Sequence, residues 1–393
     1  MGAEPNATAY SNAFPTARGE LRTALLSSVD AISKVVAANR DLAEDARTLA
    51  PGVVEALRDS GLTRMKSPRA VGGAEAHPVD QMDVIEAMTM VDPAAAWSMF
   101  ITSAVTGGAL SWLPDEAVHE MLADGSFPLM AGSLRPGGRA TPVEGGYRVS
   151  GRWSWGSGVQ HADYVAVPVL LADGSGLVRV VVPISQVEIH DTWFVLGMKG
   201  TGSTDYAMEQ VFVPDRFSSL TAKPVRGGAL YRLGYGFVVN EHGSFAYALA
   251  RLALRTVVEL AAEKKRGYAG ATGIADRAVF QRAVGEGELR LSATRLMMID
   301  VLERLFESAA DGEAPAALQA EARAAATLCT DEAITVATSL FRYAGGSAVM
   351  LGSPLQRIMR DLLTVQSHLV VSDSAYEILG QLRLGLSDTA PLR

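Results

Sequence analysis

Apolar residues recur every three or four positions between about residues 18 and 122. The run of Leu21, Leu25, Val29 and Val36 is the clearest case, and this spacing predicts a helix with one buried face. Pro93 indicates the start of another helix, because proline suits the first helical turn. The predicted helices of this part cover residues 18–36, 53–62, 79–90 and 94–110.

Short alternating runs replace the helical pattern between about residues 125 and 217, where Gly, Pro and β-branched residues are dense. Two pairs of runs flank glycine-rich turns, around Gly145 and Gly174, and each pair predicts a β-hairpin. Pro214 ends a further strand. The predicted strands include residues 140–143, 147–155, 164–171, 178–184 and 206–213. We therefore expect a β domain of about six to eight strands.

Helical spacing returns from about residue 240 onward. The basic run Lys264-Lys265-Arg266 followed by Gly267 is typical of a helix C-terminus. The predicted helices cover residues 244–266, 275–310, 314–343 and 353–382. Helices longer than about 25 residues must pack along most of their length, as in a bundle. The sequence predicts an α+β multidomain protein with an N-terminal α-helical domain (1–124), a central β-sandwich or barrel domain (125–238) and a C-terminal four-helix bundle (239–393).

Composition and charge narrow the class of protein. The 393 residues are 48% hydrophobic and 20% charged, which is the balance of a globular chain with a large core. A net charge of −8 argues against nucleic acid and anionic membranes as partners. The single cysteine, Cys329, excludes an intramolecular disulfide. With no signal-peptide pattern and no long apolar run, we expect a soluble cytoplasmic protein.

The common metal and nucleotide motifs are absent from the sequence. None of the six histidines lies three or four positions from another, and there is no HExxH motif. We therefore expect no metal site. No GxGxxG fingerprint, P-loop or GxSxG elbow occurs, which disfavours a nicotinamide enzyme, a kinase or a hydrolase.

Two segments of the predicted β domain carry candidate chemistry. Along the strand that ends near residue 158, an alternation of two places Trp153, Trp155 and Ser157 on one face. This face suits a planar aromatic ligand, or it is simply an aromatic-packed face of the sheet. The loop Gly197–Ser203 offers backbone amides with the hydroxyls of Thr201 and Ser203, which suit a phosphate or a ring edge. A plain loop explains it equally well.

The third candidate segment lies near the C-terminus. It comprises a Tyr-Ala-Gly-Gly bend at residues 343–346 and the run PLQRIMRD at residues 354–361. On one predicted helix, Arg357, Asp361 and His368 would share a face, with the first two paired. A lone helical histidine is either a site residue or a structural group.

Together these features resemble the acyl-CoA dehydrogenase fold. The helix–β–helix order, the Trp-x-Ser strand, the GTGS loop, the AGG bend and the PLQRIMRD helix occur in the family's order over about residues 18–392. The resemblance is strongest to the flavin-dependent monooxygenase branch, the two-component group D hydroxylases. Acyl-CoA dehydrogenases commonly carry a carboxylate base shortly after the Arg-Asp pair, whereas residues 364–369 contain no Asp or Glu and include His368.

The resemblance implies a reaction and its partners. Reduced flavin, FADH2 or FMNH2, would come from a separate NAD(P)H-dependent flavin reductase and react with O2 to give a C4a-hydroperoxyflavin. The substrate would be a small phenolic, polyketide or indole-type aromatic compound that becomes hydroxylated. A homotetramer with flavin at subunit contacts is also implied. An acyl-CoA dehydrogenase-like flavin dehydrogenase and an N- or S-oxygenating relative remain as alternatives.

The resemblance also implies site residues. Ser157 would hydrogen-bond the flavin N5/C4a edge and Trp155 would stack near the ring. His368, with an ordinary pKa near 6.5, would deprotonate a phenol or activate an indole N–H. Further flavin-binding candidates are Ser133, Thr201, Ser203, Arg342, Gly345 and Gly346.

Overall fold

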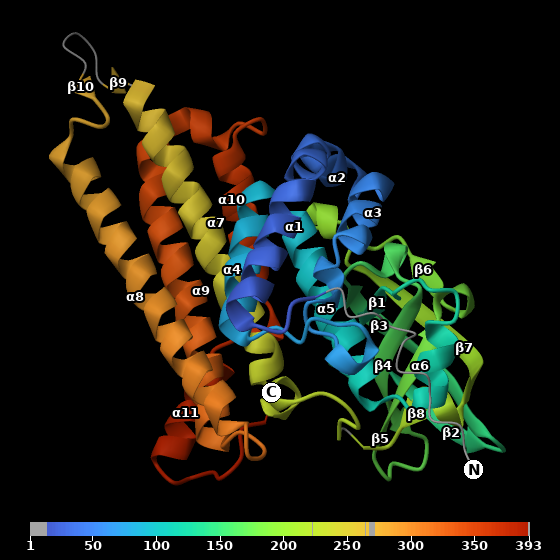
Figure 1. The fold of residues 1–393 in the computed structure, drawn as a ribbon. Helices are drawn as coiled ribbons and strands as arrows, with labels where there is room; N and C mark the ends of the chain where they lie inside the picture. The colour runs from blue at the N-terminus through green and yellow to red at the C-terminus, as the bar shows by residue number, and fades with distance from the viewer. Residues whose placement is uncertain (1–13, 222, 264, 267–271, 392–393) are drawn as a thin grey trace. The chain divides into compact units, whose positions relative to one another are not determined.

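A computed structural model describes residues 14–221, 223–263, 265–266 and 272–391 (Figure 1). The chain forms two compact units, which we call the sheet unit (Met1–His77, Ala94–Phe194 and Lys199–Tyr231) and the bundle unit (Pro78–Pro93, Val195–Met198 and Arg232–Arg393). The helix that follows His77 therefore groups with the C-terminal helices. The predicted division into three domains stays a prediction.

The helices of the sheet unit follow the apolar periodicity of the sequence. In α1, the predicted contact residues Leu21, Leu25, Val29 and Val36 are all buried. The bounds are α1 Arg18–Ala38, α2 Arg40–Ala46, α3 Pro51–Asp59, α5 Pro93–Trp112 and α6 Asp115–Met121. Proline occupies the first position of α5, as predicted.

An eight-stranded sheet has the order β6-β7-β3-β2-β4-β5-β8, and β1 pairs with β4. The strands are β1 Met130–Gly132, β2 Gly138–Val143, β3 Gly146–Gly156, β4 Tyr164–Leu171, β5 Leu177–Pro183, β6 Glu188–His190, β7 Thr204–Pro214 and β8 Ser218–Ser219. Both predicted hairpins are confirmed, as the antiparallel pairs β2–β3 and β4–β5. Gly145 takes a φ of +74° in the first turn, a conformation that favours glycine.

The core of the sheet unit includes one of the two tryptophans of β3. Trp153 stacks on Tyr206 of β7 with 5.9 Å between ring centroids, and both side chains are buried. Val149, Val165 and Val180 belong to the same apolar cluster. For Trp153, the interpretation as an aromatic-packed sheet face is therefore confirmed.

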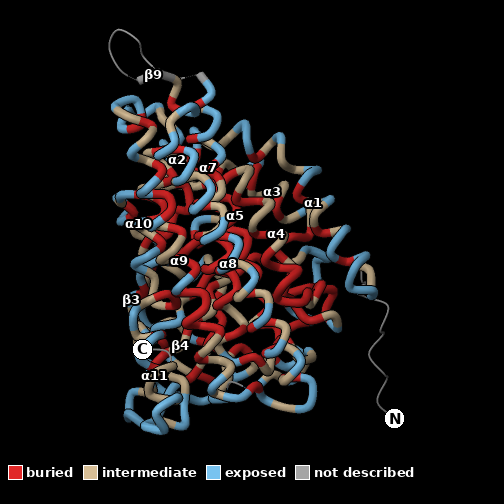
Figure 2. The backbone as a smooth tube through the Cα atoms, turned by 90° about the vertical axis from the view of Figure 1, so that its left-hand side faces the viewer, coloured by how far each residue is buried: buried red, intermediate tan, exposed pale blue. Residues whose placement is uncertain are grey.

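Long helices pack side by side in the bundle unit (Figure 1). The bounds are α4 Pro78–Val91, α7 Gly236–Glu263, α8 Ala278–Ser308, α9 Ala316–Ala344, α10 Pro354–Val365 and α11 Ser374–Arg383. Buried and exposed residues alternate along these helices, as expected for amphipathic helices that share one core (Figure 2). Within the described residues, no helix has the length and apolarity needed to cross a bilayer.

The predicted end of the first bundle helix is only partly described. Helix α7 ends at Glu263, and Lys265–Arg266 forms strand β9, which pairs with β10 (Thr272–Gly273). Lys264 and Gly267 lie outside the described residues. The expectation that Lys265 and Arg266 belong to the helix is wrong.

The predicted single helix over residues 353–382 is also wrong. Helix α10 ends at Val365, and a 3-10 turn, η9 (Leu369–Val371), separates it from α11. The Arg323 side chain of α9 donates to the carbonyl oxygens of Leu369 and Val370, which supplies hydrogen bonds that a continuous helix would otherwise provide. His368 consequently lies outside α10, and its predicted face shared with Arg357 and Asp361 does not form.

Candidate active site

Three hydroxyl groups and an indole N–H form a buried cluster in the sheet unit, which we call the hydroxyl cluster. The Nε1–H of Trp97, on α5, donates to Ser157 Oγ at 2.9 Å. Ser203 Oγ lies 2.8 Å from Ser157 Oγ and 2.7 Å from Thr201 Oγ1. Three predicted site residues are thus brought together. Sequence reasoning missed Trp97, because its indole reaches the cluster from a helix without a recognisable motif.

The predicted shared face of Trp153, Trp155 and Ser157 is wrong. Strand β3 has a bulge between Trp153 and Gly156, where Trp155 takes a φ of +63°. A bulge inserts an extra residue and breaks the alternation of faces along a strand. Trp155 is therefore 63% exposed, whereas Ser157 is 6% exposed. The two residues do not line one wall.

Gly158 fixes the loop that carries Ser157. Its φ is +74°, and a Cβ atom there would lie 3.3 Å from the Thr102 hydroxyl. The Gly158 amide donates to the Thr201 carbonyl at 3.4 Å, which links the two loops of the hydroxyl cluster. The positive φ favours glycine here, and a Cβ would also crowd the Thr102 hydroxyl.

The first part of the Gly197–Ser203 loop is held within the bundle unit. The Met198 amide donates to the buried Asp361 carboxylate at 2.5 Å. A Cβ at Gly197 would overlap the Arg360 carbonyl, so this close approach requires glycine. Asp361, in the PLQRIMRD helix, therefore holds the start of the Gly197–Ser203 loop in place. The sequence did not reveal this role.

A pair of stacked histidines lies in the bundle unit. The ring centroids of His242, on α7, and His368, just before η9, are 4.2 Å apart, with 26° between the planes. His242 Nδ1 lies 3.1 Å from the Val238 carbonyl oxygen, and the Val370 amide donates to His368 Nδ1 at 3.3 Å. Sequence reasoning missed His242, because only the packing of α7 against η9 brings the two rings together.

Burial changes the acid–base character of His368. Desolvation lowers the pKa of its imidazole from 6.5 to about 4. The ring is therefore neutral across the pH range in which most enzymes work. A group with so low a pKa is a weak base, so the expected deprotonation of a phenol by His368 loses its support.

The remaining predicted residues lie apart from these two clusters within their own units. Gly345 ends α9 with a φ of +67°, Gly346 follows in the next turn, and the Arg342 side chain is exposed. Ser133 directly follows β1 and exchanges hydrogen bonds with the Arg135 backbone. The structure gives these four residues no further contact that tests their predicted flavin-binding roles.

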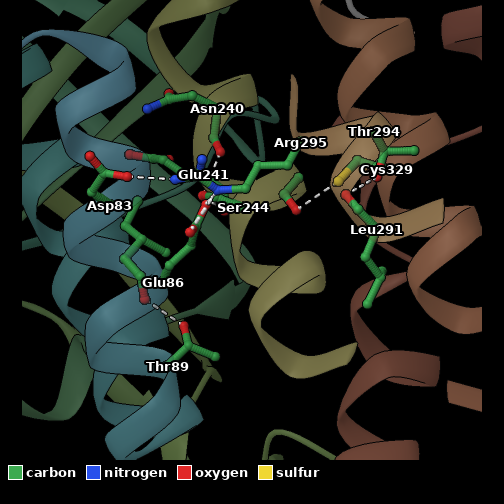
Figure 3. A network of polar contacts seen from close by, with 12 residues as sticks. Asp83, Glu86, Thr89, Asn240, Glu241, Ser244, Leu291, Thr294, Arg295 and Cys329 are labelled. Carbon is green, nitrogen blue, oxygen red and sulfur yellow. Dashed lines mark hydrogen bonds and ion pairs between the residues drawn. The ribbon is translucent and has the colours of Figure 1, made fainter. Parts of the chain in front are cut away.

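A charged cluster of three side chains joins α4 to α8 in the bundle unit (Figure 3). Arg295 Nε lies 2.9 Å from both carboxylate oxygens of Glu86, and Arg295 Nη2 lies 2.5 Å from Asp83 Oδ1. Desolvation raises the pKa of Glu86 to about 7, and Arg295 offsets this only in part. Two carboxylates therefore share one cation here.

Comparison with known proteins finds relatives that are flavin-dependent enzymes. Residues 242–373 match the family described as acyl-CoA dehydrogenase, C-terminal domain. The chain is 29% identical to indole-3-acetate monooxygenase of Pseudomonas putida over 346 residues, 86% of this chain and 88% of that protein. It is 26% identical to the flavin-dependent monooxygenase oxygenase subunit HsaA of Mycobacterium tuberculosis over 387 residues, 92% of this chain and 95% of that protein.

The solved structures show the fold of the chain. XiaF from Streptomyces, solved with FADH2 and glycerol, has a TM-score of 0.86 at 23% identity, and the match covers 96% of this chain and 98% of that one. The chain has the acyl-CoA dehydrogenase fold, and its relatives are flavin-dependent monooxygenases. The fold expected from the sequence is confirmed, and so is the resemblance to flavin-dependent monooxygenases. In this acyl-CoA dehydrogenase-fold protein, the segment after the Arg-Asp pair carries His368 and no carboxylate.

Proposed function

We propose that this protein is the oxygenase component of a two-component flavin-dependent monooxygenase that hydroxylates a small aromatic substrate. The observation that carries the proposal is His368, a neutral imidazole in the segment where acyl-CoA dehydrogenases commonly carry their carboxylate base. Without a carboxylate, removal of the α-proton from an acyl thioester lacks an acceptor. The indole-3-acetate monooxygenase among the relatives supports an aromatic substrate.

The hydroxyl cluster fits the edge of a flavin ring. Its members are neutral donors and acceptors, which match the ring nitrogens and carbonyls of a flavin. Three hydroxyls carry three protons, and the two bonds among Ser157, Ser203 and Thr201 use two of them. Ser157, which also accepts from Trp97, is our candidate for the contact with flavin N5.

Reduced flavin, FADH2 or FMNH2, when bound, supplies the activation of O2 and the transfer of one oxygen atom. The chain's own residues hold and shield the reactants. Ser157 orients the ring edge, and its burial limits access of water. His368 donates a hydrogen bond to a hydroxyl oxygen of the substrate. Trp155 and Ser133 are proposed as further flavin contacts.

The partners follow from the absence of a nicotinamide motif. An NAD(P)H-dependent flavin reductase supplies the reduced flavin, and this dependence on NAD(P)H favours the cytoplasm. The exposed Arg342 with Gly345 and Gly346 would contact flavin bound to a neighbouring copy, in a homotetramer. A dehydrogenase-like activity is disfavoured by the missing carboxylate. An N- or S-oxygenating enzyme would use the same chemistry on a different acceptor.

A turnover assay tests this function. The protein is supplied with chemically reduced FAD or FMN, O2 and a panel of phenols and indoles, and products are detected by mass. We expect an oxygenated product with reduced flavin, and none with NADH and oxidised flavin unless a reductase is added. Oxidation of an acyl thioester without oxygen insertion, or efficient NADH oxidation by this protein alone, would overturn the proposal.

A further inference from the structure

The stacking of two histidine rings goes beyond what a single contact with substrate requires. His242 comes from α7 and is 1% exposed, while the partly buried His368 follows α10. Their rings are nearly parallel at 4.2 Å. A lone imidazole could hydrogen-bond a substrate without a second imidazole beneath it. The second ring therefore calls for a role of its own.

The hydrogen bonds of the pair assign its protons. A carbonyl oxygen can only accept and a backbone amide can only donate. His242 Nδ1, facing the Val238 carbonyl, therefore carries a proton. His368 Nδ1 accepts from the Val370 amide, so the proton of neutral His368 lies on Nε2. The nitrogen that faces the backbone thus carries a proton in His242 and accepts one hydrogen bond in His368.

We propose that His242 is a positioning residue that holds the ring of His368 flat and keeps its Nε2–H as a hydrogen-bond donor. The inference rests on the proposed function, in which His368 contacts the substrate. Anchored through the Val238 carbonyl, the His242 ring provides a fixed surface for stacking. A ring already held in place loses less freedom when substrate binds.

The surroundings of His368 oppose a charged ring. A proton on His368 Nδ1 would face the Val370 N–H, and the charged ring would stack on a second imidazole. From α9, the Arg323 guanidinium donates to the carbonyl oxygens of Leu369 and Val370. From α7, Glu241 is the carboxylate next to His242 in the chain. Desolvation is the main cause of the low pKa of His368. His368 thus acts as a donor and not as a base.

Histidine NMR on the full chain tests the assignment without flavin or substrate. The 13C and 15N signals of labelled histidine report both the pKa and the tautomer of His368. We expect the Nε2–H tautomer and a pKa below about 5 in the unaltered protein. In His242→Ala the pKa should rise by about one unit or more, because water enters the vacated space and the ring is freed.

Two further variants control for packing. His242→Phe keeps a flat ring and should leave the pKa of His368 within about half a unit of the unaltered value. Leu249→Ala makes a cavity at a buried α7 position about 10 Å further along the helix. This variant should leave the pKa of His368 unchanged. An unmoved pKa in His242→Ala, or an equal rise in His242→Phe and His242→Ala, would overturn the proposal. If His242→Ala does not fold, His242→Leu takes its place, because it fills the space without a flat ring, and an unmoved pKa of His368 in that variant would overturn the proposal.

Kinetics separate this inference from the proposed function. Given monooxygenase turnover, any acid limb of kcat/KM attributable to His368 should lie below about pH 5 in the unaltered protein and should move up by about one unit or more in His242→Ala. An active monooxygenase whose His368 titrates near 6.5 would contradict only the role of His242. The expected NMR behaviour without oxygenation of any substrate would contradict only the proposed function.

Discussion

The histidine pair and the Arg295 cluster lie in the same unit, and both place ionisable groups away from water. They differ in whether those groups carry charge. Burial disfavours charge in both. The histidine pair responds by staying neutral, since the pKa of His368 falls to about 4. In the Arg295 cluster the guanidinium stays charged and pairs with both Asp83 and Glu86. One cation does not fully compensate two carboxylates, and desolvation raises the pKa of Glu86 to about 7. A neutral pair suits ligand binding, whereas a charged cluster suits the joining of helices.

The two regions therefore contribute opposite slopes to stability against pH. The folded pKa of Glu86 lies above its ordinary 4.5, so its stabilising effect is complete below about pH 4.5 and is lost as pH rises through 7. The folded pKa of His368 lies below its ordinary 6.5. Its contribution is complete above about pH 6.5 and is lost as pH falls through 4. Between pH 5 and 6.5 the two trends partly cancel.

Removing the shared cation should have the largest effect. Arg295→Ala leaves two partly buried carboxylates facing each other, and we expect a loss of about 3–5 kcal/mol in the free energy of unfolding. Urea unfolding followed by circular dichroism measures it. Arg290→Ala is the matched control, because Arg290 also bridges two carboxylates from α8 but is exposed. An equal loss in both variants would contradict the distinction between buried and surface pairs.

Neutralising Glu86 should reveal the contribution of the histidine pair. In Glu86→Gln, the decline in stability between about pH 5 and 7.5 should disappear, because the side chain no longer titrates. A shift from 4.5 to about 7 corresponds to roughly 3 kcal/mol over the full range. Unfolding free energies at half-unit pH steps measure the slope. If the slope matches that of the unaltered protein, Glu86 carries its charge throughout and Arg295 pairs with it fully.

Replacing His368 should remove the opposite trend, the loss of stability at low pH. His368→Gln keeps a hydrogen-bonding side chain but removes the titration, so stability should no longer fall as pH drops from 6.5 to 4. We expect a change of roughly 2 kcal/mol, because the ring is partly exposed. The same unfolding series measures it, with Glu86→Gln/His368→Gln as the internal check. The double variant should be flatter than either single variant, and a steeper profile would contradict the opposite signs.

The sequence predicted repeating features better than it predicted contacts. The apolar spacing of Leu21 and Leu25 and the turn at Gly145 are local signals, and the helix and hairpin they predict are present. The break after Val365 depends on Arg323, which reaches it from another helix, so no local pattern marks it.

The candidate site shows the same limit. Thr201 and Ser203 were predicted because hydroxyl side chains in a glycine-rich loop are visible in the sequence. Ser157 was predicted from the Trp-x-Ser strand, although the alternation behind that prediction is wrong. Trp97 and His242 come from helices in which their neighbours look like ordinary packing residues. The predicted pKa near 6.5 for His368 failed for a related reason, because desolvation depends on the folded surroundings.

The smallest expected effect concerns the hydroxyl cluster, which is buried and neutral like the histidine pair. The experiment tests whether this cluster, too, contributes to the reaction. Ser157→Ala removes one hydroxyl and leaves the Trp97 N–H and Ser203 without that partner. A hydrogen bond of this kind is worth about 1 kcal/mol, so we expect H2O2 released per O2 consumed to rise severalfold, with product falling in proportion. An oxygen electrode with peroxide detection measures both. Ser218→Ala is the control, since that hydroxyl donates to Asp215 within its own turn. If coupling in Ser157→Ala equals that of the control, Ser157 is a structural member of the cluster and the flavin edge is held elsewhere.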